Sequence, residues 1–302
     1  MCVPEGQRMS TEAYAGFLQA IGHRVVQTDT TWWFNVYGGV YMNFPFHRPV
    51  VPQKIEVEKL LGLSGLVARY TCPLSVGRRS YQIICDTANY DLENLSGNVR
   101  SKVRRGLKRC EVRPLAFEEL DEAGAIELNS DTLVRQGRPV PHNLDAYWRR
   151  YYRAASNVPT AETWGAFVDR KLAAYLVAFR IEDCSNIFIL RSSRTHLNAY
   201  PNNALMFVYL REALARPNIT HVSFGLEPIQ GALDSLDHFK SEMGFIHRPI
   251  GQRIVMNRML APLIGTQTCQ ILGRLAMSQA TRERISKFVG MARWYAEQPK
   301  CH

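Results

Sequence analysis

The sequence predicts a mixed α/β (α+β) protein in which helices cover a sheet, and three observations support this prediction. Apolar residues make up 46% of the 302 residues and charged residues 21%, which is typical of a globular chain. In the second half, strand and helix patterns alternate in the order strand, hairpin, strand, buried helix, strand, helix, strand. Proline and glycine stand between these segments, where turns are expected.

The expected strands are runs rich in β-branched and aromatic residues. They cover Thr31–Tyr41 with a Gly-Gly turn or bulge, Gly65–Thr71, Ser80–Cys85, Glu111–Pro114, Trp164–Val168, Ala173–Ile181, Ile187–Ser192, His221–Phe224 and Arg248–Met256. Two of these runs flank Asp169-Arg170-Lys171, a short polar sequence that predicts a hairpin.

Apolar residues spaced by three and four predict the helices. They cover Thr11–Ile21, Ile55–Leu63, Asn98–Cys110, Phe117–Ser130, Asn203–Arg216, Leu233–Met243 and most of Pro262–Tyr295. The Asn203–Arg216 segment is apolar nearly all round in its first half, so we expect it to be buried. We expect three parts along the chain: an N-terminal half (1–115), a main domain (116–257) and a helical tail (258–302).

Charge and cysteine usage narrow the class of protein. The net charge of +10 favours anionic partners such as nucleic acid, phosphorylated cofactors or acidic membrane surfaces. Seven cysteines without a C-x-x-C pair predict neither a zinc site nor a full disulfide framework, and they fit a reducing cytoplasm. The first ten residues contain no apolar run, and no stretch approaches the roughly 18 apolar residues of a membrane span, so we expect a cytoplasmic protein.

One segment, Asn98–Cys110, combines a narrow apolar face with a wholly cationic outer face. At 100° per residue, Val99, Val103 and Leu107 share one side of the helix. The remaining surface carries Arg100, Lys102, Arg104, Arg105, Lys108 and Arg109. Six cations without an acid predict binding of RNA, nucleotide phosphates or anionic lipid, and the alternative is a solvated helix face.

Lys240 is the most informative single residue. It falls within an apolar helical stripe formed by Leu233, Leu236, Phe239 and Met243. A lysine there costs free energy unless an anion meets it or its stem reaches outward to solvent. The functional interpretation is a cation directed at the oxyanion of an acyl transfer or at a donor phosphate.

Several neighbouring residues could take part in proton transfer. Glu227 follows the strand end at Gly225 and ranks first as proton acceptor, ahead of Asp234 and Asp237. His196 and Tyr200, in the loop after the third strand of the second half, are further acid or base candidates. The alternatives are surface carboxylates and, for Asp234, a charge at a helix N-terminus.

Asn202 and Asn203 open the buried helix that follows this loop. Free N–H groups at a helix start favour phosphate or carbonyl oxygen, whereas the alternative is ordinary capping by asparagine. The sequence contains no G-x-S-x-G, Walker A or H-E-x-x-H motif, and no cysteine has a positioned histidine, so we expect neither the corresponding hydrolases nor a thiol nucleophile.

Four segments together resemble the FemAB-like branch of the GNAT acyltransferases. They are the basic helix, the hairpin with the strand after it, NAYPNNALMFVYLREAL, and HVSFG followed by LDSLDHFKSEMGF. The resemblance covers about residues 96–256. It implies a GNAT-like sheet covered by helices, with residues 1–115 as a degenerate GNAT-like half.

This resemblance also implies a reaction. An acyl group would pass from acyl-CoA or from aminoacyl-tRNA to an amine. The acyl-CoA would be a co-substrate and not a permanently bound cofactor, and no metal would be needed. The amine would belong to an amino acid, an amino sugar or a lipid-linked precursor. Donor contacts would fall on Arg194, Asn202, Asn203 and Phe239, the last preceding Lys240 in the family's Phe-Lys pair.

One departure leaves alternatives open. Residues 194–203 contain no glycine, so the usual GNAT pyrophosphate loop is missing. The alternatives are a nucleic-acid- or tRNA-binding protein, with or without catalysis, and a catalytically inactive GNAT-like scaffold. Attachment to the inner face of a membrane through the basic C-terminal helices is compatible with an acyltransferase.

Overall fold

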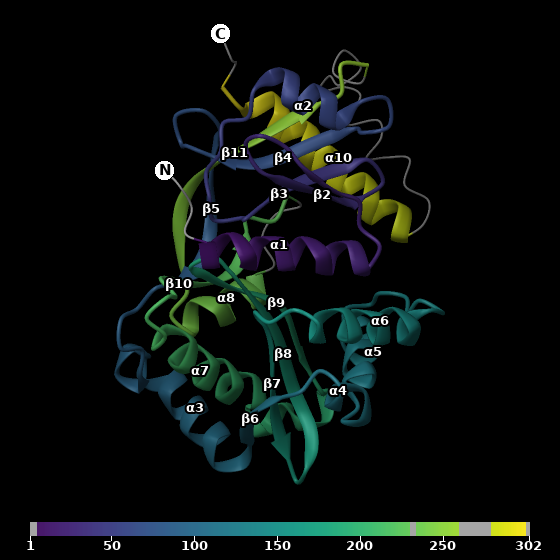
Figure 1. The fold of residues 1–302 in the computed structure, drawn as a ribbon. Coiled ribbons are helices and arrows are strands. Elements are labelled where there is room, and N and C mark those ends of the chain that lie inside the picture. Colours follow the sequence, from purple (N-terminus) through teal and green to yellow (C-terminus); the bar gives the residue numbers. More distant parts are fainter. Residues whose placement is uncertain (1–4, 230–233, 260–278, 300–302) are drawn as a thin grey trace. The chain divides into compact units, whose positions relative to one another are not determined.

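The computed structural model describes residues 5–229, 234–259 and 279–299, and the chain forms two compact units (Figure 1). Unit 1 consists of Met1–Ile21, Ile83–Gly225 and Asp234–Ile246, and unit 2 of Gly22–Gln82, Leu226–Leu233 and His247–His302. The units therefore interleave along the chain. One crossing falls inside a strand, β5 (Arg78–Cys85), where no change in composition marks it.

Unit 1 is built on strands in the order β10-β9-β8-β7-β6. Their bounds are β6 (Glu111–Leu115), β7 (Ala161–Val168), β8 (Lys171–Ile181), β9 (Cys184–Ser192) and β10 (His221–Leu226). Strands β6 to β9 are antiparallel, and β10 runs parallel to β9, which makes the sheet mixed. The predicted hairpin is confirmed: Asp169 and Arg170 form a two-residue turn between β7 and β8, with φ of 48° and 64°.

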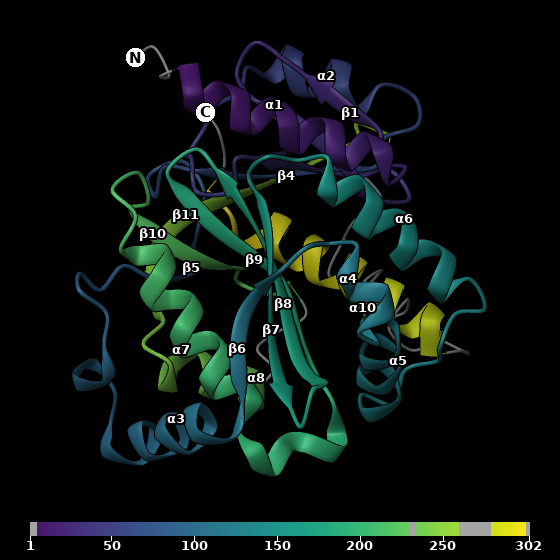
Figure 2. The same cartoon turned by 60° about the horizontal axis from the view of Figure 1, so that its bottom comes forward.

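The helices of unit 1 cover both faces of this sheet. They are α1 (Glu5–Ala20), η1 (Leu92–Asn94), α3 (Gly97–Arg109), α4 (Glu119–Glu122), α5 (Ala125–Arg135), α6 (Leu144–Ser156), η2 (Arg194–Ala199), α7 (Pro201–Leu214) and α8 (Asp234–Glu242). Helix α7 lies on one face and is followed outward by α3, whereas α5 and α6 lie on the other face (Figures 1 and 2). Aromatic side chains fill both layers, with Trp164 against Tyr209 on the α7 side and Tyr175 against Tyr152 on the α6 side.

Unit 2 contains strands in the order β1-β2-β3-β4-β11, with α2 and α10 on opposite faces. Their bounds are β1 (Val25–Gln27), β2 (Trp32–Tyr37), β3 (Val40–Phe44), β4 (Val67–Cys72), β11 (Ile246–Met256), α2 (Lys54–Leu61) and α10 (Gln279–Glu297). Strands β3 and β4 are parallel and the other pairs antiparallel. Alternate residues of a strand face opposite sides, so Tyr70 packs toward α2 and Val67 toward α10.

The expected mixed α/β sheet covered by helices is confirmed, with corrections to single elements. The segment predicted as a strand with a Gly-Gly turn or bulge, Thr31–Tyr41, forms two strands joined by that turn, since Gly38 and Gly39 both take positive φ between β2 and β3. Helix α6 and strand β1 stand where no element is predicted. The C-terminal helix is present as α10, whereas residues 262–278 of the predicted helical stretch and Leu233 lie outside the described residues.

Gln298, the residue that follows α10, completes the hydrogen bonding of β11. Ile254 of that strand pairs with Arg69 of β4. The Ile254 N–H donates to Oε1 of Gln298 at 2.9 Å, and the Ile254 carbonyl accepts from Nε2 at 2.7 Å. One side-chain amide thus makes both bonds that a neighbouring strand residue would make with Ile254. Separately, no helix within the described part of the chain has the length and apolar character needed to cross a membrane.

Candidate active site

Lys240 is buried near the end of α8 in unit 1, with 5% of the residue exposed. Its Nζ lies 3.0 Å from Oδ1 of Asp237, one turn earlier on the same helix, and 4.9 Å from the ring centroid of Phe224 on β10. A carboxylate and an aromatic face both lower the cost of burying an ammonium group. The stem therefore does not reach outward to solvent, and Asp237 is the anion that the sequence pattern requires.

Asp237 retains an unused acceptor. Its Oδ2 is enclosed and has no hydrogen-bond partner among the described residues. A carboxylate oxygen without a donor has room to accept a hydrogen bond or a proton from a bound group. Lys240 and Asp237 thus place a cation and a proton acceptor side by side.

The end of α8 is held by contacts with three other segments of unit 1. The Tyr90 hydroxyl donates to the Met243 carbonyl at 2.9 Å, and Nδ2 of Asn203 lies 3.7 Å from the Met243 sulfur. Burial raises the pKa of Tyr90, so its hydroxyl remains a donor at neutral pH. Phe245 meets Phe224 edge to face. These contacts fix the helix turn that carries Lys240 against β10 and α7.

The start of α7 offers few free donors for a phosphate. Pro201 has no N–H, and the N–H groups of Asn203 and Ala204 both donate to the Tyr200 carbonyl. The Tyr200 N–H donates to the Leu197 carbonyl. Of the first-turn N–H groups, that of Asn202 alone has no partner within the described chain, whereas a phosphate cradle uses several.

The other predicted residues of this loop lie around η2. Nδ2 of Asn202 donates to Oγ of Ser192 on β9, and the Arg194 N–H donates to Asp131 on α5, so both are used in holding the loop. His196 contacts only its neighbour Thr195 among the described residues. Two of the predicted donor-binding residues lie closer to Lys240. Asn203 on α7 contacts Met243, just after α8, and the half-buried Phe239 directly precedes Lys240 on α8.

Helix α3 packs directly on the start of α7 through a glycine. A Cβ on Gly106 would lie 2.8 Å from the Tyr200 carbonyl oxygen and 3.0 Å from Cβ of Ala204. Arg109 donates to the Asn198 carbonyl at 2.9 Å, and the guanidinium of Arg105 lies over the Tyr200 ring. The first turn of α7 is thus covered by another helix.

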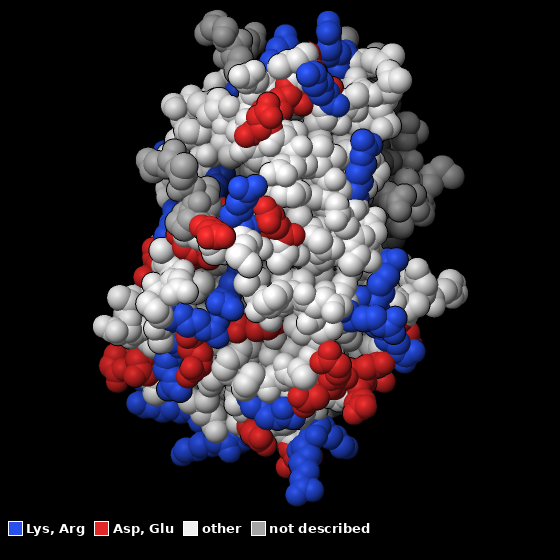
Figure 3. All heavy atoms as spheres, viewed as in Figure 1, with Lys and Arg blue, Asp and Glu red and all other residues white. Residues whose placement is uncertain are grey.

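The cations of α3 divide into two groups. Arg100 and Lys102 are half-buried, and Lys102 pairs with Glu242 of α8 at 2.9 Å. The exposed group comprises Arg104, Arg105, Lys108 and Arg109. Basic side chains gather over α3 at the lower left of Figure 3. The exposed group forms a cationic surface on the outer side of the helix.

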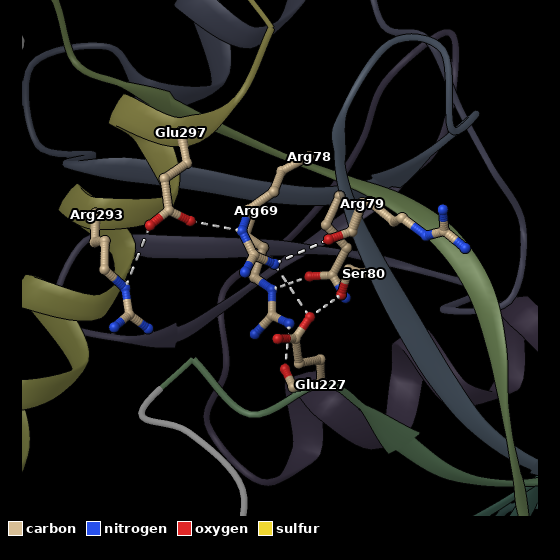
Figure 4. Close-up of polar contacts among 8 residues, drawn as sticks. Arg69, Arg78, Arg79, Ser80, Glu227, Arg293 and Glu297 are labelled. Carbon is tan, nitrogen blue, oxygen red and sulfur yellow. Dashed lines mark hydrogen bonds and ion pairs between the residues drawn. The ribbon is translucent and has the colours of Figure 1, made fainter.

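Glu227, ranked first by sequence as proton acceptor, belongs to unit 2. Its Oε2 accepts from Ser80 at 2.7 Å and pairs with Arg78 at 3.2 Å, and its backbone carbonyl accepts from Arg69 (Figure 4). Arg78 also pairs with Glu297 of α10 at 2.9 Å. Burial lowers the pKa of Arg69 to about 10, which leaves it charged at neutral pH. The carboxylate of Glu227 is therefore occupied by two donors of its own unit.

Two residues that the site uses are not among the candidates from sequence. Phe224, which contacts the Lys240 ammonium, precedes Gly225 at the strand end, and an aromatic at that position is a usable signal. Tyr90 lies in an irregular segment after β5, and its contact with Met243 spans 153 residues, so no local pattern could indicate it.

Comparisons with known proteins place this architecture in a class. A scan against protein-family models finds no match, and a search of curated proteins finds none either. Among solved structures, FemX aligns with a TM-score of 0.60 at 14% identity, over 87% of this chain and 99% of FemX. The fold is thus shared with FemX, and the FemAB-like fold that the sequence resemblance predicts is confirmed.

Two further structures share the fold. The C-terminal domain of a putative lysylphosphatidylglycerol synthetase from Agrobacterium fabrum aligns with a TM-score of 0.55 at 13% identity, over 89% of this chain and 96% of that domain. L-PGS from Bacillus licheniformis aligns with a TM-score of 0.51 at 14% identity, over 86% of this chain and 94% of that one. At these identities the likeness concerns the fold.

Proposed function

We propose that this protein transfers an acyl or aminoacyl group to an amine and that Lys240 stabilises the transition state. The observation that carries this proposal is the buried ammonium of Lys240, held by Asp237 and Phe224 at the junction of α8 and β10. A cation in a water-poor site acts strongly on charge that develops during a reaction.

The reaction then proceeds by direct attack. The amine nitrogen bonds to the donor carbonyl carbon, and the carbonyl oxygen gains negative charge that Lys240 stabilises. Asp237 accepts the proton that the amine loses. The tetrahedral intermediate collapses with cleavage of the thioester C–S bond of acyl-CoA or the ester C–O bond of aminoacyl-tRNA, and the leaving sulfur or oxygen takes up a proton.

Between the two donors, the described surface favours aminoacyl-tRNA. The start of α7 has one unengaged N–H and is covered by Gly106 of α3, which does not suit the pyrophosphate of CoA. The exposed cations of α3 suit a longer polyanion, because each cation that meets a phosphate adds to affinity by releasing a counterion. The name lysylphosphatidylglycerol synthetase, carried by a protein of the same fold, states a product with a lysyl group and supports aminoacyl transfer here.

We propose that the acceptor is an amine of an amino acid, an amino sugar or a lipid-linked precursor, and that the protein is cytoplasmic, with any membrane contact peripheral to the inner face.

Transfer is tested with radiolabelled aminoacyl-tRNAs and with acetyl-, medium- and long-chain acyl-CoAs, each offered with a panel of amine acceptors. We expect product from aminoacyl-tRNA and a loss of about 100- to 1000-fold in rate for Lys240→Ala. Product formed only from acyl-CoA would show that acyl-CoA is the donor. No product with any pair of donor and acceptor would contradict the proposed transferase activity.

A neutral pair separates charge from packing. Lys240→Gln with Asp237→Asn keeps a polar pair in the same place, so we expect folding to survive while transfer is lost. Melting temperature and circular dichroism check the fold. Full activity in this double variant would mean that the ion pair serves the structure and not the reaction.

The α3 surface is tested by tRNA binding at several salt concentrations. With four exposed cations on phosphates, the logarithm of the binding constant should fall with the logarithm of salt concentration with a slope of about −3 to −4. Arg104→Gln with Lys108→Gln should remove about half of that slope. Arg135→Gln with Arg153→Gln, two exposed cations on α5 and α6, is the control and should leave the slope unchanged.

RNA binding without catalysis is the second candidate, and the exposed cations of α3 favour it specifically. It would replace the enzyme if tRNA binds with the expected salt dependence while no donor and acceptor pair yields product. If neither tRNA nor acyl-CoA binds, a scaffold working through protein contacts is the remaining interpretation.

A further inference from the structure

Unit 2 contains a cavity of about 420 Å³ that the proposed reaction does not use. It lies between α2 and the last residues of β11, and it reaches Tyr295 and Gln298 at the end of α10. Its volume falls within the usual range for pockets that hold small molecules. Val57, Leu61 and Ile254 belong to its largely apolar wall, and all three are buried.

A buried arginine lies in this wall. Arg253 is 9% exposed, and the hydrogen bond described for its guanidinium goes from Nη1 to the Val76 carbonyl. A guanidinium has five N–H donors, so this bond leaves most of them unused. No carboxylate within the described residues forms an ion pair with Arg253. A buried cation without an anion is costly, and an anionic ligand would remove that cost.

The charged side chains around the cavity are mainly cationic. Lys54 and Arg258 line it as exposed cations, and Glu58 is the single acid among the lining residues. The adjoining residues include apolar side chains that are largely open to solvent: Ile55 is 53% exposed and Leu63 is 97% exposed. The cavity thus combines an apolar interior, one deep cation and a cationic rim.

We infer that this cavity binds a small anionic amphiphile, with its carboxylate or phosphate on Arg253 and its apolar part against the α2 side. Charge complementarity at Arg253 selects the head group, and the apolar wall holds the tail. The site lies wholly in unit 2, so the inference does not depend on transfer at Lys240.

The probes are dodecanoate, dodecyl phosphate and dodecanol, with affinities measured by calorimetry on the full chain below their micelle-forming concentrations. We expect both anions to bind at least about tenfold more tightly than dodecanol, because a hydrogen bond to a charged group is strong. Preference for dodecanoate or for dodecyl phosphate would identify the head group. Equal affinity for all three, or no binding of either anion, would overturn the inference.

Variants locate the site. Arg253→Gln should abolish the preference for the anions over dodecanol, and Arg253→Lys should restore part of it. Arg258→Glu changes only an exposed rim residue and should still weaken anion binding, which covers the case in which Arg253 variants fail to fold. Arg79→Gln removes an exposed cation of unit 2 outside the lining and is the control.

Lys240→Ala separates this inference from the proposed function. It should lose transfer and keep dodecanoate affinity unchanged. Loss of the anion preference in Arg79→Gln as strongly as in Arg253→Gln would indicate general charge attraction, and would contradict binding at Arg253.

Discussion

Glu56, at the start of α2, links that helix to the chain before β2. Its two carboxylate oxygens accept from the backbone N–H and the hydroxyl of Thr30, at 3.2 Å and 2.6 Å. Burial alone would raise the pKa of Glu56, but hydrogen bonds from Thr28 and Thr30 outweigh it and lower the pKa in the folded protein. The carboxylate therefore stabilises the fold in its ionised form.

Glu56→Gln should accordingly reduce the free energy of unfolding by about 0.5–1 kcal/mol at pH 7. A pKa lowered by folding gives stability that is complete above the unfolded pKa and is lost as the pH falls through the folded one. The difference between wild type and variant should thus shrink below about pH 4. Urea unfolding of both proteins at pH 7 and pH 3.5 measures it, and a difference that does not change with pH would contradict this assignment.

At the residue scale, the sequence predicts whether a side chain is buried better than it predicts which residues that side chain pairs with. Lys240 falls on an apolar stripe, so its burial could be predicted, and its intrahelical partner Asp237 was within reach of helical spacing. Glu227 shows the limit: its partners Arg78 and Ser80 are nearly 150 residues away, and proximity to Gly225 in sequence did not indicate them. Contacts of that range depend on the fold as a whole.

At the element scale, the packing of α3 on α7 depends on the absence of one side chain. Gly106 faces the Tyr200 carbonyl, whereas a Cβ on Gly97, at the start of the same helix, would meet no atom within 4 Å. The two glycines of one helix therefore differ in the space around them and provide a matched pair.

Gly106→Ala should lower the free energy of unfolding by about 1–3 kcal/mol, because the added methyl group must displace backbone or Ala204. Gly97→Ala should leave stability unchanged or raise it by up to about 1 kcal/mol, since alanine is the better helix former. Thermal unfolding of the two variants gives the comparison. Equal effects would show that α3 does not pack closely on α7.

Element prediction succeeds where local chemistry decides. The turn at Asp169-Arg170 lies between two apolar runs, and both hairpin strands form as expected. Helix α6 was missed because its aromatic residues, such as Trp148 and Tyr152, suit strands and helices alike. Tyr152 packs against Tyr175 of β8, and Trp148 packs against Tyr152, so the burial that favours the helix depends on a contact outside the segment.

At the scale of the whole molecule, the two units draw on alternating stretches of one chain. Strand β5 passes from one unit to the other without a proline, a glycine or a charged linker at the crossing. Boundaries of this kind depend on which strands pair with one another, and the amino-acid composition does not change at them.

The cysteines provide a whole-molecule test of folding. Cys72, Cys85, Cys110 and Cys184 are buried, and burial raises the pKa of the Cys85 and Cys110 thiols. Because the thiolate is the reactive form, we expect these four to react with a disulfide reagent only after unfolding.

The measurement uses Cys2→Ser, Cys269→Ser and Cys301→Ser together, because these three lie outside the described residues. This triple variant should show no fast thiol when native and four after addition of denaturant. One fast-reacting equivalent in the native protein would show that one of the four is accessible.

The amide of Gln298 has a consequence for how this protein behaves in concentrated solution. A strand position with an open N–H and C=O is a template on which another chain can add a strand. By occupying both groups of Ile254, Gln298 stops that addition with a side chain, which cannot propagate a ladder. Loss of the Gln298 side chain would thus leave the N–H and C=O of Ile254 open to such addition, at one position of a strand that otherwise lies between β4 and β5.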